Sequence, residues 1–195
     1  ISMPFDKRRS GFIMSEGSYV FVLEGHDYAV SRGARIYGEV SGYGSIFAGG
    51  RNSDTGKRVE KAGNAMKKCI DDAGMSTDDI DLINANGNSG KLPDLIEAKA
   101  IKELFGEESK EIPVHTVKSA LGESYGASGA MQTASALLSI NNSLIPPTIN
   151  YEEKDPECNL NVVNEKLEKE VNTVLINSFD LSGNNSCLIV KKIGT

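Results

Sequence analysis

Apolar and polar positions follow one another along the chain in a way that predicts helices and strands in turn. From Lys57 to Ala73, apolar residues recur at the spacing of a helix with one buried face, and Gly74 ends the run. Leu92 to Phe105 has the same amphipathic pattern. Shorter apolar runs predict strands at 81–83, 113–117, 172–179 and 186–193. The resulting order of elements predicts a layered α/β fold, with helices on both sides of one mixed sheet.

The remaining helix in this order, Gly122 to Ile140, has helical periodicity but consists largely of Ala, Ser and Gly. Each glycine lowers helix propensity. Close packing on both sides would explain this composition, so we expect a central, nearly buried helix. The residues that follow cannot continue it, because 141–150 contains Pro146 and Pro147. The acidic stretch 151–157 has the composition of a surface loop.

The amino-terminal part contains two further strand candidates, Ser18 to Glu24 and Arg35 to Val40, with a short polar helix candidate at 26–32 between them. They come before any helix that could cover them. Since the first residue is Ile1 rather than Met, we expect a piece of a longer product. The stretch from Gly42 to Gly56, with five glycines, is the best internal boundary.

Composition and charge narrow the class of protein. The chain has 195 residues, of which 39% are hydrophobic and 25% charged, and its formal net charge is -6. These values fit an ordinary globular protein, and acids interleaved with the lysines argue against a nucleic-acid surface. No apolar run has the length of a membrane span, and no signal peptide is visible. We therefore expect a cytoplasmic protein.

The residue types that most often bind metals or act as nucleophiles do not cluster in the sequence. Cys69, Cys158 and Cys187 are far apart and odd in number, which fits neither a disulfide framework nor a metal knuckle. His26 and His115 have no partners at ligand spacing. We expect reduced structural thiols, and neither a metal nor a cofactor.

Asn84 to Gly90 (NANGNSG) is the stretch best placed to meet a ligand, since it follows a short apolar run and precedes a predicted helix. In α/β proteins, ligands bind at the carboxyl ends of buried strands. The seven residues offer amides, a hydroxyl and bare backbone, but no group that titrates near neutral pH. The alternative is a polar turn, since Asn and Gly both tolerate positive φ.

Segments along the whole chain resemble, in order and spacing, the β-ketoacyl-acyl carrier protein synthase family. Pro4 to Phe12 (PFDKRRSGF) is similar to the family signature PFD-x-x-R-x-GF. Asn84 to Gly87 is similar to the NAHGT box, and Val117 to Gly122 to the TKS-x-x-GH box. The closing segments of the family are matched at 146–150 and 177–183.

The resemblance implies a thiolase-like fold of two related halves, in a protein longer than this chain. Residues 1–43 then correspond to the end of the amino-terminal half. Residues 44–195 correspond to the carboxyl-terminal half, a layered α-β-α unit with a mixed five-stranded sheet. The nucleophilic cysteine of the family precedes the PFD segment and is therefore absent, and none of the three cysteines present matches it.

At the two positions where family members use histidine to bind the malonyl thioester, this chain has Asn86 and Glu123. Asn86 keeps an amide donor but cannot exchange a proton at neutral pH. An ionised Glu123 would repel the malonyl carboxylate and the enolate. Losing one preorganised donor costs on the order of a hundred- to a thousandfold in rate. The resemblance therefore implies a vestigial pocket with no catalytic residues.

Two further features of the family can be compared, a lysine–glutamate ion pair and the closing loop. Lys118 matches the family lysine and Glu97 the glutamate that pairs with it. We expect this ion pair either as a remnant of the pocket or as a structural salt bridge. The closing GFGGTN loop is changed at Asp180, Leu181 and Asn184, with Leu181 at the gating aromatic position. The change either alters the access of acyl chains or is drift in a loop that no longer gates anything.

These departures resemble the chain-length factors of type II polyketide and related systems, which pair with an active condensing subunit. The sequence thus predicts half of a non-catalytic subunit in fatty acid or polyketide biosynthesis. Its expected partners are acyl carrier protein and either a homologous condensing subunit or its own amino-terminal half, in a dimer. Two alternatives remain open: a divergent synthase, an acyltransferase whose amino-terminal part supplies the cysteine, and a stand-alone scaffold that binds the carrier protein.

Overall fold

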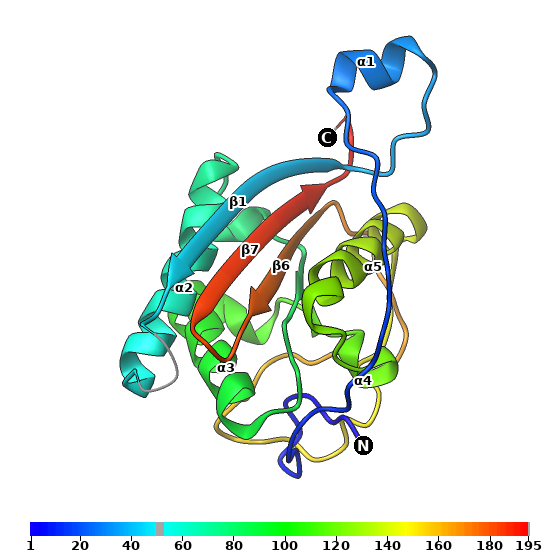
Figure 1. Cartoon of the computed structure of the whole chain (residues 1–195). Coiled ribbons are helices and arrows are strands. Elements are labelled where there is room, and N and C mark those ends of the chain that lie inside the picture. Colours follow the sequence, from blue (N-terminus) through cyan, green and yellow to red (C-terminus); the bar gives the residue numbers. More distant parts are fainter. Residues whose placement is uncertain (50–52, 195) are drawn as a thin grey trace.

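The computed structural model describes residues 1–49 and 53–194 and contains strands and helices in alternation (Figure 1). The strands are β1 (Glu39–Phe47), β2 (Leu82–Asn84), β3 (Val114–His115), β4 (Leu144–Ile145), β5 (Leu167–Glu168), β6 (Thr173–Phe179) and β7 (Asn184–Lys191). The helices are α1 (His26–Ser31), α2 (Thr55–Asp72), α3 (Lys91–Phe105), α4 (Lys118–Leu121) and α5 (Ser128–Asn142). Short 3₁₀ helices lie at Thr77–Asp79, Gly106–Lys110 and Tyr125–Ala127.

One mixed five-stranded sheet forms the centre, in the order β1-β7-β6-β2-β3. β2 runs parallel to β6 and β3, whereas β7 runs antiparallel to β6 and β1. β4 and β5 pair in a separate small sheet that the sequence pattern did not predict. The predicted mixed five-stranded sheet is confirmed.

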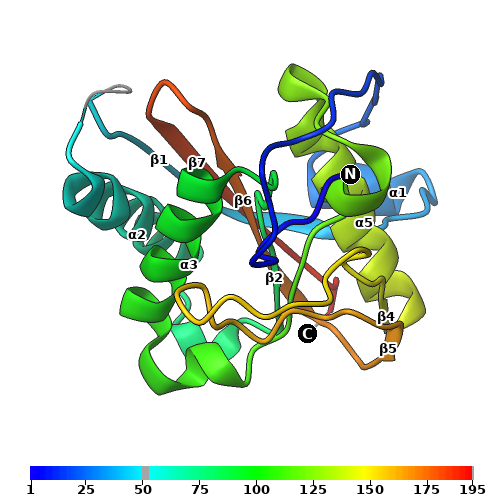
Figure 2. The same ribbon diagram turned by 90° about the horizontal axis from the view of Figure 1, so that it is seen from below.

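The sheet lies between two layers of helices, as predicted (Figure 2). α2 and α3 cover one face and α5 covers part of the other. The alternation of side chains in β6 shows why both layers are needed, because Leu175 joins the apolar cluster under α2 and α3, whereas Val174 and Ile176 join the cluster under α5. No helix within the described residues is both long enough and apolar enough to cross a membrane.

The glycines at 42 and 44 are part of an interior packing surface. A Cβ at Gly42 would lie 2.3 Å from the carbonyl oxygen of Cys69, and one at Gly44 would lie 2.2 Å from that of Ala65. β1 can therefore approach α2 this closely only without side chains at these positions. The first part of the stretch predicted as an internal boundary therefore lies in a packed strand, while residues 50–52 of that stretch lie outside the described residues. The division predicted between residues 43 and 44 falls within β1 and stays a prediction.

α5 begins later than predicted and is buried on one face. Its buried residues include Met131, Gln132, Ala136 and Ile140, whereas Leu138 is 57% exposed. Nothing lies within 4 Å of a Cβ placed at Gly129. The prediction of close packing on both sides is wrong for this chain, because the sheet covers only one side of the helix.

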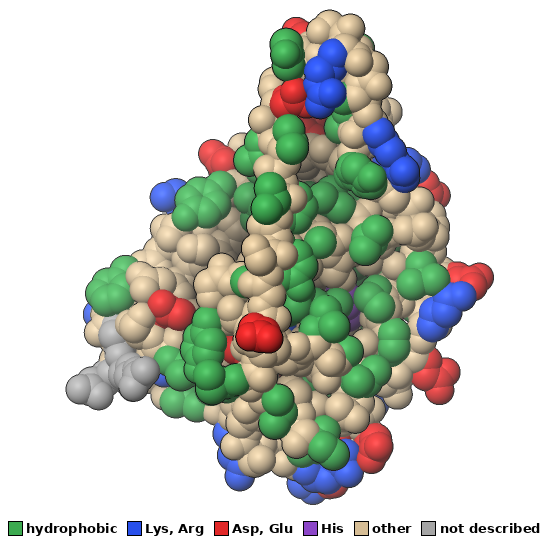
Figure 3. Space-filling model, turned by 45° about the vertical axis from the view of Figure 1, so that its right-hand side comes forward, with side chains coloured by type: hydrophobic (Ala, Val, Ile, Leu, Met, Phe, Trp, Pro, Cys, Tyr) green, Lys and Arg blue, Asp and Glu red, His purple; other side chains and the backbone are tan. Residues whose placement is uncertain are grey.

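The predicted strand from Ser18 to Glu24 is extended but has no strand partner among the described residues. Val20 and Leu23 are 89% and 79% exposed. The segment runs past α5 (Figure 1), and the N–H of Ser15 donates to the carbonyl of Glu123 at 2.9 Å. Hydrophobic side chains gather over this face of the molecule (Figure 3). An extended segment is a strand only when a neighbour accepts its backbone hydrogen bonds.

The acidic stretch 151–157 is not wholly a surface loop. Tyr151 and Asp155 are buried, and Asp155 accepts a hydrogen bond of 2.5 Å from the guanidinium of Arg9. The charge of Asp155 is thus matched by a buried cation, which allows an acidic stretch to lie against the core.

Candidate functional site

The loop from Asn84 to Gly90 leaves the end of β2, between its parallel neighbours β6 and β3. Its backbone is held by α3, because the N–H groups of Asn86 and Gly87 donate to the carboxylate of Glu97 at 2.8 and 2.9 Å. Glu97 is buried, and burial raises its pKa against the lowering effect of these hydrogen bonds. The loop therefore has a fixed conformation at the carboxyl edge of the sheet.

Lys118 joins two of the predicted site residues. Its Nζ lies 2.8 Å from Oδ1 of Asn86 and 2.8 Å from Oε2 of Glu123. The side chain of Lys118 is 1% exposed and that of Glu123 is 9% exposed. Three predicted pocket residues thus form one cluster, reached from the loop after β2, the start of α4 and the turn that follows it.

Glu97 is not the ion-pair partner of Lys118, contrary to the prediction. Besides the two backbone donors, Glu97 accepts a hydrogen bond of 3.0 Å from Nδ2 of Asn177. Among the described residues, the carboxylate within salt-bridge distance of Lys118 belongs to Glu123. Glu123 follows the C-cap of α4 directly, which brings its carboxylate to the lysine at the start of that helix.

Glu123 also differs from the expectation of an uncompensated negative charge. Its Oε1 accepts hydrogen bonds from the N–H of Tyr125 at 3.0 Å and from the hydroxyl of Ser128, while Oε2 meets Lys118. The carboxylate is therefore neutralised and hydrogen-bonded within the chain. Repulsion of an incoming anion by Glu123 is correspondingly weaker than the sequence alone suggests, and its effect on condensation stays a prediction.

The altered loop after β6 is a tight turn organised by Asp180. The carboxylate of Asp180 accepts hydrogen bonds from the N–H groups of Gly183 and Asn184 at 2.7 and 2.9 Å and from the hydroxyl of Ser182 at 2.8 Å. Burial acts to raise the pKa of Asp180, but the hydrogen bonds outweigh it and lower the pKa. Leu181 is 37% exposed at the tip. Asp180 thus has a structural reason to be present, which the sequence pattern did not reveal.

Two buried amides that the sequence analysis missed tie the site to the sheet. Gln132 of α5 donates from Nε2 to the carbonyls of Ala85 and Asn177, both at 2.9 Å. Asn177 in turn donates to Glu97. A polar residue within an apolar helix face, as Gln132 is, was the available signal.

The buried Asp94 connects the amino-terminal turn to the same loop. Its carboxylate accepts the N–H of Phe5 at 2.8 Å and the N–H of Asn88 at 3.0 Å, and Nε of Arg9 lies 3.8 Å away. Burial raises the pKa of Asp94 to about 7. The segment resembling PFD-x-x-R-x-GF is therefore anchored directly against the candidate site.

In the described part of the chain, the cysteines make no hydrogen bond with Lys118, Asn86 or Glu123, although the thiol of Cys187 donates to Oδ1 of Asn177 at 3.3 Å. The backbone carbonyl of the buried His115 accepts the N–H of Ala85 at 2.8 Å. Burial raises the pKa of Cys69 and of Cys158 to about 12, and it also raises the pKa of Cys187. Thiols of this kind are poor nucleophiles. No group of three or more His, Cys, Asp or Glu side chains arranged for a metal occurs among the described residues.

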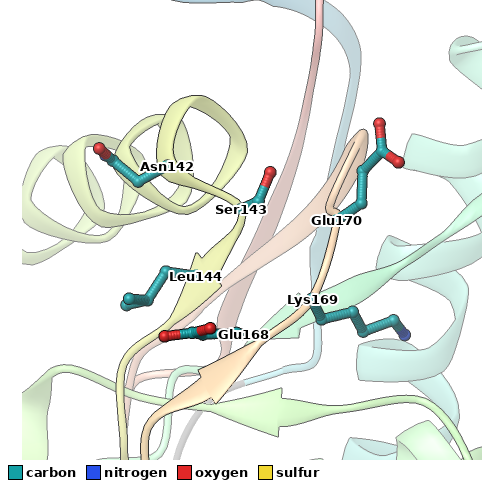
Figure 4. A pocket seen from close by; sticks show the side chains of 6 residues that line it. All are labelled: Asn142, Ser143, Leu144, Glu168, Lys169 and Glu170. Atoms are coloured by element: carbon teal, nitrogen blue, oxygen red, sulfur yellow. The ribbon is translucent and has the colours of Figure 1, made fainter.

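An open hollow of about 340 Å³ lies elsewhere, between the end of α5 and the β4–β5 ladder. The side chains of its six lining residues point in different directions and do not converge on one point (Figure 4). None of the predicted site residues lines it. The hollow therefore gives no support to a second binding site.

A family model described as "Beta-ketoacyl synthase, C-terminal domain" matches residues 37–152. Among curated relatives, 3-oxoacyl-[acyl-carrier-protein] synthase 2 of Staphylococcus aureus (strain COL) is 38% identical over 97% of this chain and 46% of the relative. The protein of the same name from Coxiella burnetii (strain RSA 493 / Nine Mile phase I) is 37% identical over 98% of this chain and 47% of the relative. The chain spans about half the length of these relatives.

Solved structures agree with the sequence matches and confirm the predicted thiolase-like half. The ishigamide ketosynthase/chain length factor superimposes with a TM-score of 0.92 at 37% identity, over 100% of this chain and 47% of that chain. A type II polyketide synthase acyl-carrier protein in complex with its ketosynthase gives a TM-score of 0.93 at 30% identity, over 98% and 47%. A β-ketoacyl synthase from Burkholderia phymatum STM815 gives 0.92 at 30%, over 99% and 47%.

Proposed function

The chain belongs to the β-ketoacyl synthase family, as its carboxyl-terminal half, and from this premise we propose that it is part of a non-catalytic, chain-length-factor-like subunit. Such a subunit contributes to fatty acid or polyketide biosynthesis by shaping the space in which an active partner builds the acyl chain. On this proposal Asn86, Glu123, Lys118 and Glu97 form a vestigial pocket, and Asp180, Leu181 and Asn184 form the loop at its entrance.

The observation that carries the proposal is the ion pair between Lys118 and Glu123, with Asn86 as the third member. Decarboxylative condensation needs preorganised donors aimed at the developing enolate, and each lost donor costs on the order of a hundred- to a thousandfold in rate. Here the group at one replaced position is a carboxylate engaged by Lys118, and the other is an amide that cannot exchange a proton. The polar groups of Lys118, Glu123 and Asn86 bind one another, which favours a structural role for them over a catalytic one.

A second candidate is a divergent β-ketoacyl-ACP synthase, an acyltransferase whose nucleophilic cysteine lies in an amino-terminal portion. The names of the relatives from S. aureus and C. burnetii favour it. On this alternative, Lys118 and Asn86 would supply the donors that histidine supplies in other members.

Membership of the β-ketoacyl synthase family also indicates which partners the chain binds. The neighbouring structures contain an acyl-carrier protein with its ketosynthase and a ketosynthase with its chain length factor. We therefore assign to this chain an acyl carrier protein and, in a dimer, a homologous condensing subunit or its own amino-terminal half. Residues 1–43 would then be the end of that amino-terminal half, in a cytoplasmic protein without metal or cofactor.

The deciding experiment measures elongation of acyl-ACP with malonyl-ACP by the whole protein alone, beside the S. aureus synthase as a positive control. We expect no condensation above the background without enzyme. The double variant Asn86→His/Glu123→His should stay inactive as well, since restored donors do not supply a nucleophile. Elongation by the unmodified protein at the rate of the control would overturn the proposal in favour of the synthase.

A further inference from the structure

The side chain of Asn177 in β6 has a hydrogen-bond partner on each of three neighbouring elements. Its Nδ2 donates to Oε1 of Glu97 in α3 at 3.0 Å and to the sulfur of Met66 in α2 at 3.4 Å. Its Oδ1 accepts from the thiol of Cys187 in β7 at 3.3 Å. Asn177 is fully buried, so bulk water cannot replace any of these partners.

The chemistry of the three partners allows one orientation of this amide. A carboxylate and a thioether only accept hydrogen bonds, so both must face the NH₂ group of Asn177. The thiol of Cys187 faces the oxygen and can donate to it. Burial raises the pKa of Cys187, so the sulfur keeps the proton that this hydrogen bond requires.

The sheet places Cys187 for this contact. Cys187 lies directly opposite Asn177 in the antiparallel pairing of β6 and β7, and side chains that are paired in this way project from the same face. Cys187 is 1% exposed. In the described part of the chain, it is the residue that donates to Oδ1 of Asn177.

The hydrogen bonds continue from Asn177 to the loop of residues 84–90. Oε1 of Glu97, which accepts from Asn177, also accepts the N–H of Asn86 at 2.8 Å. Oε2 of Glu97 accepts the N–H of Gly87 at 2.9 Å. The amide of Asn177 therefore helps to fix the carboxylate that holds the loop.

We propose that Cys187 is a positioning residue for this loop. Its thiol keeps the amide of Asn177 in the orientation that donates to Glu97. Glu97 in turn holds the backbone N–H groups of Asn86 and Gly87. Without the thiol, Oδ1 of Asn177 would be buried without a partner, and rotation of the amide would break its hydrogen bond to Glu97. The inference does not rest on the proposed function, since the loop is held in the same way whether or not the pocket catalyses a reaction.

The test compares Cys187→Val with Cys187→Thr, because valine and threonine have nearly the same shape and only threonine can donate a hydrogen bond. Backbone hydrogen exchange of the whole protein is followed by mass spectrometry in the peptide that contains residues 84–90. We expect the amides of Asn86 and Gly87 to exchange about tenfold faster in Cys187→Val than in the unmodified protein, because one buried acceptor has lost its partner. Cys187→Thr should restore the slow exchange.

Ile189→Val is the matched control for a change of packing in the same strand. Ile189 is fully buried in the same apolar cluster as Cys187 and lies two residues further along β7. This variant should not accelerate exchange in the loop. Should Cys187→Val fail to unfold cooperatively, Cys187→Ala and Cys187→Ser replace the first pair, since alanine removes the same donor and serine keeps a hydroxyl.

Equal exchange of the loop in Cys187→Val and Cys187→Thr, or in Cys187→Ala and Cys187→Ser, overturns the positioning role of the thiol. The same acceleration in Ile189→Val would overturn it as well, because packing alone would then explain the effect. None of these results bears on the elongation assay. Failure of this inference and failure of the proposed function are therefore observed separately.

Discussion

Lys118 determines how the two replaced positions behave, because both of them use it as their cationic partner. From the sequence alone, Asn86 is an amide that cannot exchange a proton, and Glu123 is an uncompensated negative charge. In the structure, the ammonium of Lys118 orients the amide of Asn86 and neutralises the carboxylate of Glu123. The orientation of Asn86 therefore depends on a contact with a residue 32 positions away in the chain, whereas the partner of Glu123 lies in the helix just before it.

We predict that removing the lysine alone is more harmful than removing both charges. Lys118→Met leaves the carboxylate of Glu123 buried without a cation and should lower the free energy of unfolding by about 3–5 kcal/mol. Lys118→Met/Glu123→Met should cost less than the single change, because no buried charge remains. Urea denaturation of the single and double variants measures both values, and a strictly additive double variant would show that the pair is not coupled.

His115 should make the folded protein less stable as the pH falls. It is buried, its two ring nitrogens have no partner within the described residues, and burial lowers its pKa from 6.5 to about 4. Between pH 6.5 and 4 the unfolded chain binds a proton that the folded chain does not, so stability is lost as the pH falls through this window. The full shift corresponds to about 3 kcal/mol.

The measurement compares the unfolding free energy of the unmodified protein with that of His115→Leu from pH 7.5 to 4. As the pH falls, the unfolding free energy of the unmodified protein should decrease relative to that of His115→Leu. Asp94, whose pKa is raised to about 7, acts in the opposite sense but is present in both proteins and cancels in the difference. A difference that is independent of pH would contradict the assignment to His115.

At the scale of elements, β1 and α2 show how one residue type serves two purposes. Gly42 and Gly44 lie where the strand touches the helix, whereas Gly63 lies inside α2 with no contact closer than 3.9 Å to an added Cβ. A glycine count alone does not separate these cases. The spacing of the glycines at alternate positions of an extended segment is the signal that could have identified a packed strand face.

We predict opposite effects for one substitution at two of these glycines. Gly44→Ala should destabilise the protein, because its Cβ would lie 2.2 Å from the carbonyl oxygen of Ala65, and overpacking of this kind costs about 1–3 kcal/mol. Gly63→Ala should stabilise it by about 0.5–1 kcal/mol through the preference of helix interiors for alanine. Thermal unfolding of the two variants gives the signs, and a tolerated Gly44→Ala would show that β1 and α2 can separate.

At the scale of the whole molecule, large apolar side chains are left exposed. They include Phe47 of β1 (61%), Leu138 of α5 (57%), and Val20 and Leu23 of the extended amino-terminal segment, and hydrophobic side chains gather on the face shown in Figure 3. Large exposed apolar surfaces mark contacts with other proteins.

We predict that the chain by itself associates in a concentration-dependent way through these exposed side chains. Phe47→Glu/Leu138→Glu should shift it toward monomer in sedimentation velocity. Leu92→Glu is the control, because Leu92 is 42% exposed at the start of α3, on a different element from the two substituted residues. A monomer at all concentrations that also unfolds cooperatively would instead support the stand-alone carrier-binding scaffold.

The sequence by itself determined the elements whose apolar pattern is local, such as α2, α3, β6 and β7, and it determined the family through motifs read along the chain. It also located the loop of Asn86, since a strand end is visible in a short run of residues. Only the tertiary structure decided which charges meet. Lys118 pairs with Glu123 and not with Glu97, Asp155 is matched by Arg9, and the glycines of β1 face α2. The physical reason is that periodicity reports the burial of each residue, whereas the partner of a buried charge or the neighbour of a glycine is set by how turns and segments are arranged in three dimensions.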